Sequence, residues 1–251
     1  MIYFCSDLDN TLIYSYRHDI GKEKILVETK EGKELSYMSK ASYELLQAVA
    51  KEKELVPLTT RSLEQYARID FGSRVKIKYA LTSNGGILLE DNKINEDWFR
   101  ETKEIVSRAE EEMQKGIELL KKDENVCFEI RMVDEVAVFT KSNNPEATMK
   151  RLKEALDTDR VDISNHGIKV YIFPKTIDKG SALRRFRKYI GGEQQFIAAG
   201  DSSFDVSMLL AADTAFCPEH LNIPESTGKG QVVKLPQHRF TEEMLQRVLC
   251  I

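Results

Sequence analysis

The sequence predicts an α/β protein with a Rossmann-like parallel-sheet core and an α+β domain inserted into that core. Short apolar runs, such as residues 2–5 and 195–199, suit strands buried on both faces, and they alternate with helical patterns at both ends of the chain. Between them the order becomes helix-strand-strand-helix-strand-strand, which is typical of two helices on an antiparallel sheet. We therefore expect a core over residues 1–91 and 176–251, and an inserted domain over 92–175.

The composition excludes several classes of partner. The 251 residues carry 37 basic and 41 acidic side chains, a net charge of −4. A chain with this balance of charge has no excess of positive charge to bind nucleic acid or an anionic membrane. No apolar stretch approaches the ~20 residues that cross a bilayer, and the N-terminus lacks a signal-peptide pattern. The four cysteines are far apart in the sequence, as is typical of reduced thiols. We expect a cytoplasmic protein that acts on a small molecule.

The first part of the core has clear boundary signals. Ser39 is a suitable N-cap for the helix that follows it, and Asn84 before a glycine supplies the positive φ of a turn. Pro57 predicts irregular pairing within its strand, because proline cannot donate to a ladder. The expected order is a strand at 2–5, a hairpin of 24–28 and 34–38, a helix after 39, a strand at 54–60, a short helix to 68, and strands at 78–82 and 87–90.

The inserted domain begins with a long amphipathic helix after Asn95. Its remaining elements are expected to be strands at 126–132 and 135–140, a helix from 145 to 156, and strands at 161–164 and 168–173. The core then resumes with a helix at 178–189, a strand at 195–199, a helix at 203–210, a strand at 214–217, a glycine-rich loop at 228–230 and a helix from 241.

Two carboxylates end the first strand. Asp7 and Asp9 are one residue apart where the strand meets the carboxyl edge of the sheet, and open α/β sheets bind ligands at that edge. Carboxylates this close repel each other, and a hard cation such as Mg²⁺ would relieve that repulsion. A pair of acids that only caps a turn is the alternative interpretation of these two residues taken alone.

Further polar groups occupy similar positions at strand ends or helix starts. These are a hydroxyl, an ammonium and two more carboxylates: Thr59, Lys179, Asp201 and Asp205. A nucleophile, a proton donor, cations and carboxylates together are what phosphoryl transfer through an aspartyl-phosphate requires.

The order of these groups resembles the four motifs of the haloacid dehalogenase (HAD) superfamily. The matching segments are Asp7-Leu-Asp-Asn-Thr11, Leu58-Thr59, Asp178-Lys179-Gly180 and Gly200-Asp-Ser-Ser-Phe-Asp205. The single insertion resembles the small C2-type cap of the Cof-like and sugar-phosphate phosphatase branch. Four ordered motifs form a specific signal where any one of them would be weak.

The resemblance implies a role for each residue. Asp7 would attack phosphorus, Asp9 would act as acid and then base, and Thr59 and Lys179 would hold phosphoryl oxygens. The implied Mg²⁺ ligands are Asp7, the carbonyl of Asp9 and Asp201, with Asp205 in support. Two positions depart from the family pattern: Phe204 replaces an expected Asn, and Thr60 replaces an expected Gly.

Four residues are candidates for substrate binding: Arg61, Asn84, Arg131 and Lys169. Alternation in the inserted strands predicts that apolar faces pack under the two helices, while opposite faces carry Arg131 and Lys169. We expect those polar faces to cover the site at Asp7 and to bind a hydroxyl-rich substrate.

The sequence favours a Mg²⁺-dependent phosphatase that acts on a small phosphorylated metabolite, with a sugar phosphate as the preferred class. A phosphomutase of the same superfamily is the first alternative, and it would depend on a bisphosphate activator. The second is a regulatory or binding module that has lost catalysis, although the complete set of motif residues argues against it.

Overall fold

The computed structural model describes residues 1–224 and 230–251, so most of the expected loop at 228–230 lies outside the described residues. The chain forms two compact units: unit 1 contains Met1–Ile94 and Lys179–Ile251, and unit 2 contains Asn95–Asp178. The inserted domain was predicted over residues 92–175. In the part of the chain that the structure describes, no helix has the length and apolar character needed to cross a membrane.

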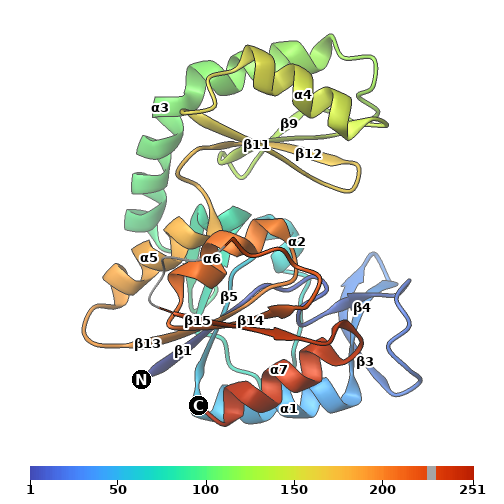
Figure 1. Cartoon of the computed structure of the whole chain (residues 1–251), viewed down its shortest axis with the longest axis vertical. Helices are drawn as coiled ribbons and strands as arrows, with labels where there is room; N and C mark the ends of the chain where they lie inside the picture. The colour runs from blue at the N-terminus through green and yellow to red at the C-terminus, as the bar shows by residue number, and fades with distance from the viewer. Residues whose placement is uncertain (225–229) are drawn as a thin grey trace. The chain divides into compact units, whose positions relative to one another are not determined.

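Unit 1 is built on a five-stranded parallel sheet in the order β15-β14-β13-β1-β5. Helices α1 and α7 cover one face of this sheet, and α5 and α6 cover the other (Figure 1). The α/β prediction for the core is therefore confirmed. The strands are β1 (Ile2–Ser6), β5 (Glu54–Pro57), β13 (Gln195–Ala199), β14 (Thr214–Pro218) and β15 (Gln231–Leu235); the helices are α1 (Lys40–Glu52), α5 (Lys179–Ile190), α6 (Val206–Ala211) and α7 (Phe240–Leu249).

Strand β1 lies between β5 on one side and β13 on the other, in register from Ile2↔Gln195 to Ser6↔Ala199. Its side chains from Phe4 to Ser6 are fully buried, as the apolar run predicted. The strand order reverses around β1, and a doubly wound sheet binds ligands at the carboxyl end of such a switch point. The residues that follow β1, β5 and β13 therefore meet at a single edge.

Pro57 ends β5 without disturbing its pairing with β1. The N–H of the next residue, Leu58, donates to Ser6 O at 2.8 Å, so the nitrogen of Pro57 points to the other side of the strand. On that side a bridge starts one residue later, where Leu58 pairs with Leu81. The absence of an N–H group on Pro57 therefore costs no hydrogen bond between β5 and β1.

Two small antiparallel sheets complete unit 1. The first, in the order β2-β4-β3, is the expected hairpin with a short extra strand: β2 (Tyr14–Ser15), β3 (Lys24–Lys30) and β4 (Lys33–Ser39). The second contains β6 (Tyr79–Thr82), β7 (Ile87–Glu90) and β8 (Lys93–Ile94), and the short helix α2 (Leu63–Tyr66) precedes it. Ser39 caps α1 as predicted, because its hydroxyl accepts from Ser42 N at 3.1 Å.

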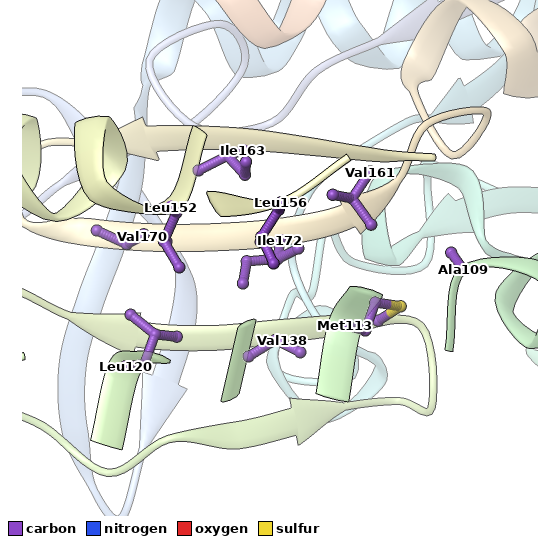
Figure 2. Close-up of a cluster of buried hydrophobic side chains, with 10 residues drawn as sticks. All are labelled: Ala109, Met113, Leu120, Val138, Leu152, Leu156, Val161, Ile163, Val170 and Ile172. Atoms are coloured by element: carbon purple, nitrogen blue, oxygen red, sulfur yellow. The ribbon is translucent and has the colours of Figure 1, made fainter. Parts of the chain in front are cut away.

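Unit 2 packs two helices on one face of a four-stranded antiparallel sheet in the order β11-β12-β10-β9. Figure 2 shows the apolar cluster between these two layers, which includes Met113 of α3, Leu152 of α4 and Ile172 of β12. This is the predicted α+β architecture. Its elements are α3 (Glu96–Lys121), β9 (Arg131–Val133), β10 (Ala137–Lys141), α4 (Pro145–Ala155), β11 (Val161–His166) and β12 (Lys169–Pro174).

The predicted strand at 126–132 is wrong over most of its length. Only Arg131–Val133 form β9, and Val126 makes an isolated bridge to Ser142. The chain between them is irregular, so the alternation rule does not hold there. Phe128, expected on the apolar face, instead contacts Phe139 with ring centroids 6.0 Å apart. Phe139 neighbours the buried Val138 in β10 and therefore points to the opposite side of the sheet.

Candidate active site

The first motif forms a tight loop at the end of β1. Asp7 continues the strand, since its N–H donates to Ala199 O of β13 at 2.9 Å. The carbonyl of Leu8 then accepts from the N–H groups of Leu12 and Ile13, both at 2.9 Å. Asn10 closes the loop with φ +59°, a left-handed conformation that asparagine tolerates well. The loop thereby fixes the backbone on both sides of Asp9.

Lys179, the first residue of α5, lies 1% exposed between two carboxylates. Its Nζ is 2.5 Å from Asp7 Oδ1 and 2.5 Å from Asp205 Oδ1. Burial by itself would lower the pKa of Lys179, but the charges of Asp205 and Asp7 and their hydrogen bonds raise it above its ordinary value. Lys179 is therefore a buried ammonium ion that links the first, third and fourth motifs.

Asp205 uses both carboxylate oxygens within the protein. Oδ1 accepts from Lys179, while Oδ2 accepts from the N–H groups of Asp201 (3.1 Å) and Ser202 (2.9 Å) and from the Ser202 hydroxyl (2.8 Å). The fully buried Asp205 therefore positions Lys179 and the loop after β13. A Cβ on Gly200 would lie 2.3 Å from Asp205 Cβ, so only glycine permits this close approach.

Asp7, Asp201 and Asp205 each offer an oxygen within 4.8 Å of the others. Burial raises the pKa of Asp7 well above its ordinary value; the Lys179 charge opposes this shift, and the Asp205 and Asp201 charges add to it. Burial and the charge of Asp205 also raise the pKa of Asp201 to about 7. A divalent cation fits this donor set, because it would supply positive charge to crowded oxygen ligands.

Thr59 follows β5 and is fully buried. Its N–H donates to Leu81 O and its carbonyl accepts from Asn84 N, both at 2.9 Å, so the second motif is fixed to the turn after β6. Ser83 and Asn84 have φ values of +50° and +61°, as the predicted turn at Asn84 required. The structure thus places Asn84 beside the backbone of the second motif.

Arg61 binds two carboxylates. Its Nε and Nη2 lie 2.8 Å from Asp9 Oδ2 and Oδ1, and its Nη1 and Nη2 lie 2.9 and 3.0 Å from the carboxylate of Glu28. The Asp9 side chain is 50% exposed, whereas that of Glu28 is 2% exposed. Arg61, a candidate for substrate binding, is thus engaged by the predicted acid–base residue and by a buried glutamate.

Arg131 and Lys169 lie in unit 2, on strands β9 and β12. Arg131 is opposite Phe139 in the ladder, and its guanidinium carbon is 5.2 Å from the centre of that ring. Lys169 is opposite Lys141, on the same face as Tyr171. The face away from α3 and α4 therefore combines cations with aromatic rings.

The structure brings together residues of the first, third and fourth motifs, namely Asp7, Lys179, Asp201 and Asp205. Glu28 is the residue that sequence reasoning missed. It was placed on a hairpin strand, and nothing in the local pattern indicated that its side chain is buried against arginines.

A family model described as haloacid dehalogenase-like hydrolase matches residues 48–219. This range contains the second, third and fourth motifs and lies after the first. No curated protein matches the chain at the level of sequence.

Solved structures resemble the whole chain. A sucrose-phosphatase from Synechocystis, in complex with sucrose and phosphate, has a TM-score of 0.65 at 15% identity, over 98% of this chain and 97% of that one. A trehalose-6-phosphate phosphatase from Aspergillus fumigatus has a TM-score of 0.55 at 11% identity, over 100% and 93%. An IMP-nucleotidase from Plasmodium falciparum has a TM-score of 0.59 at 13% identity, over 98% and 69%. These likenesses extend across both units and establish a shared fold.

Proposed function

Because the chain belongs to the haloacid dehalogenase-like hydrolases, we propose that it is a Mg²⁺-dependent phosphatase that hydrolyses a small phosphorylated metabolite through an aspartyl-phosphate. The observation that carries the proposal is the arrangement of Lys179, 2.5 Å from Asp7, beside the carboxylates of Asp201 and Asp205. This arrangement offers a nucleophile, a fixed cation and a set of oxygen ligands at the carboxyl edge of the sheet.

In the first step, an Asp7 carboxylate oxygen attacks the phosphorus of the ester. The bond from phosphorus to the ester oxygen breaks as the alcohol leaves. Asp9, which in its protonated form keeps only one of its two hydrogen bonds to Arg61, gives its proton to that oxygen. Lys179 and the hydroxyl of Thr59 hold the phosphoryl oxygens, on which charge accumulates in the transition state. The product is an acyl phosphate on Asp7 and a free alcohol.

In the second step, Asp9, now a carboxylate, takes a proton from water as the water oxygen attacks the phosphorus. The bond to Asp7 breaks, which releases inorganic phosphate and returns both aspartates to their starting forms. Asp7, the Asp9 carbonyl and Asp201 would hold Mg²⁺, with Asp205 as a supporting residue. When bound, the ion neutralises negative charge on the transferring group.

A sugar phosphate is the substrate class that we propose. Two of the similar structures are a sucrose-phosphatase and a trehalose-6-phosphate phosphatase, and a third is an IMP-nucleotidase, so nucleotides are the class to compare against. Arg131 and Lys169 would bind polar groups of the substrate beyond its phosphate.

A panel of sugar phosphates, nucleotides and other phosphorylated metabolites tests the proposal directly. We expect phosphate release that disappears in a chelator and returns when Mg²⁺ is restored. Undiminished release from thoroughly metal-depleted protein would exclude the metal role of Asp201. If the protein instead transfers the phosphoryl group within the substrate, requires a bisphosphate activator and releases little inorganic phosphate, it is a phosphomutase.

Asp9→Asn should discriminate between leaving groups. An amide cannot donate the proton that an alkoxide requires, so kcat/KM for a sugar phosphate should fall by about 10²- to 10⁴-fold. The kcat/KM for nitrophenyl phosphate should fall much less, because nitrophenolate leaves with little protonation. Steady-state kinetics on both esters checks this prediction, and equal losses would mean that Asp9 is not the acid.

Arg131→Ala and Lys169→Ala should each weaken transition-state binding of the preferred substrate by about 1–3 kcal/mol, if each removes a charge-assisted hydrogen bond. Hydrolysis of nitrophenyl phosphate should change little. Lys150→Ala is the matched control, because this residue lies on α4 and its side chain is 79% exposed. If kcat/KM for the preferred substrate is unchanged in both variants, other residues recognise it.

A further inference from the structure

Glu28 is a buried carboxylate in a strand whose regular pleat would expose it. Val27 and Glu28 are adjacent yet only 1% and 3% exposed, whereas side chains in a regular strand alternate between two faces. The register between β3 and β4 shifts on both sides of Glu28, from Leu26↔Tyr37 to Glu28↔Ser36 and then to Thr29↔Glu34. Such bulges redirect side chains next to functional sites. Here the irregularity directs Glu28 inward.

The position of Glu28 is fixed by several contacts. Its carboxylate accepts from Ser36 Oγ at 2.6 Å and from Arg68 Nε at 3.1 Å, in addition to Arg61. Its backbone forms a bridge with Ile69, and the preceding residue, Val27, accepts from Asp70 N at 2.9 Å. Burial alone would raise the pKa of Glu28, but the hydrogen bonds from Arg61 and Ser36 and the charge of Arg68 hold it below its ordinary value. Glu28 is therefore an ionised, immobile anchor.

The guanidinium of Arg61 connects this anchor to Asp9. The edge formed by Nη1 and Nη2 binds Glu28, and the edge formed by Nε and Nη2 binds Asp9. Because the guanidinium is planar and rigid, fixing one edge fixes the direction of the other. The exposed carboxylate of Asp9 is thus oriented through Arg61 by a residue of the hairpin.

We propose that Glu28 is a positioning residue for catalysis: it holds Arg61, and Arg61 fixes where the carboxylate of Asp9 lies before Asp9 exchanges a proton with the ester oxygen or with water. This inference rests on the proposed phosphatase function. It assigns to the β3–β4 hairpin a part in the acid–base step, through the contacts of Glu28 with Ser36, Arg61 and Arg68.

The test compares the kcat/KM of the Glu28→Gln variant for two phosphate esters whose leaving groups differ in their need for a proton. The amide places an N–H group against one donor of Arg61, so the guanidinium turns and Asp9 loses its orientation. We expect kcat/KM for a sugar phosphate to fall by about 10-fold or more, while nitrophenyl phosphate hydrolysis falls by much less. A purely structural role for Glu28 would lower both activities equally, and that result would overturn the proposal.

Two further variants sharpen the comparison. In the Asp9→Asn background, Glu28→Gln should have no additional effect on the ratio of the two kcat/KM values, because its target is already removed. Glu34→Gln is the matched control: it makes the same change on the neighbouring strand β4, where Glu34 accepts from Tyr37. This control should leave the ratio as in the wild type.

A crystal structure of Glu28→Gln tests the inference without turnover. We expect at least one of the two 2.8 Å contacts between Arg61 and Asp9 to be lost. Retention of both contacts would overturn the inference even if the wild-type protein hydrolysed no phosphate ester. Absence of hydrolysis by the wild type would instead count against the proposed function, so the two failures are distinguishable.

Discussion

Asp7→Asn is expected to abolish phosphate release, with a loss in kcat of about 10⁴-fold or more, because an amide is a poor nucleophile and a weak ligand for Mg²⁺. The fold should survive. Burial and the charges of Asp205 and Asp201 raise the pKa of Asp7 although the Lys179 charge lowers it, so ionising Asp7 in the folded protein costs free energy. A neutral amide of the same shape carries no such cost.

Phosphate release and thermal unfolding should be measured on the same preparation. Asp91→Asn is the matched control, since it makes the same change in an exposed turn with φ +48°, a conformation that asparagine tolerates. The control should retain full activity. Turnover by a well-folded Asp7→Asn protein at a rate comparable to the wild type would exclude the aspartyl-phosphate mechanism.

Lys179→Met should destabilise unit 1 by about 3 kcal/mol or more, in addition to abolishing activity. The substitution removes the cation that lies 2.5 Å from both Asp7 and Asp205, and it leaves buried carboxylates without their partner. Denaturant unfolding measures this loss. Lys188→Met, a change at an exposed position of the same helix, should shift stability by no more than about 0.5 kcal/mol.

The destabilisation caused by Lys179→Met should depend on pH. The Lys179 charge lowers the pKa of Asp7, so its removal raises that pKa further above the ordinary Asp value of about 3.9. The folded variant then binds protons more tightly than its unfolded chain, and its stability falls as pH rises from about 4 toward neutral. Adding Asp205→Asn should recover part of the loss, because it removes one unpaired carboxylate. A deficit that stays constant between pH 4 and pH 7 would contradict this account.

Much of unit 1 could be predicted from sequence because its signals are local. Strands buried on both faces form continuous apolar runs, and β13 was predicted with the bounds Gln195–Ala199 that the structure has. The resemblance to the HAD superfamily is confirmed by the family match, and with it the prediction of a hydrolase. Ser39, chosen as a helix cap from its residue type, accepts the expected hydrogen bond from Ser42 N, and the long helix expected after Asn95 begins at Glu96.

The errors arose where long-range packing decides the structure. The stretch before β9 alternates in sequence, yet it makes only a single bridge at Val126, and Phe128 packs against Phe139 and Lys141. The inward direction of Glu28 depends on shifts in register between β3 and β4, which no local pattern encodes. Arg61 was recognised as polar and close to a motif, but its two partners are separated from it by 52 and 33 residues in sequence.

The central position of β1 has a consequence for the order in which the protein assembles. As the chain emerges during synthesis, β1 can pair early with β5. Its other neighbour is β13, and the pairing of these two strands begins only at Ile2 with Gln195. Until then one side of this apolar strand has no partner and is exposed to pairing with other chains. Lys179 and Asp201 also arrive late, so Asp7 is synthesised long before the residues that surround it. Long-range pairing of this kind predicts slow folding and a nascent chain that is prone to aggregation until its last third is complete.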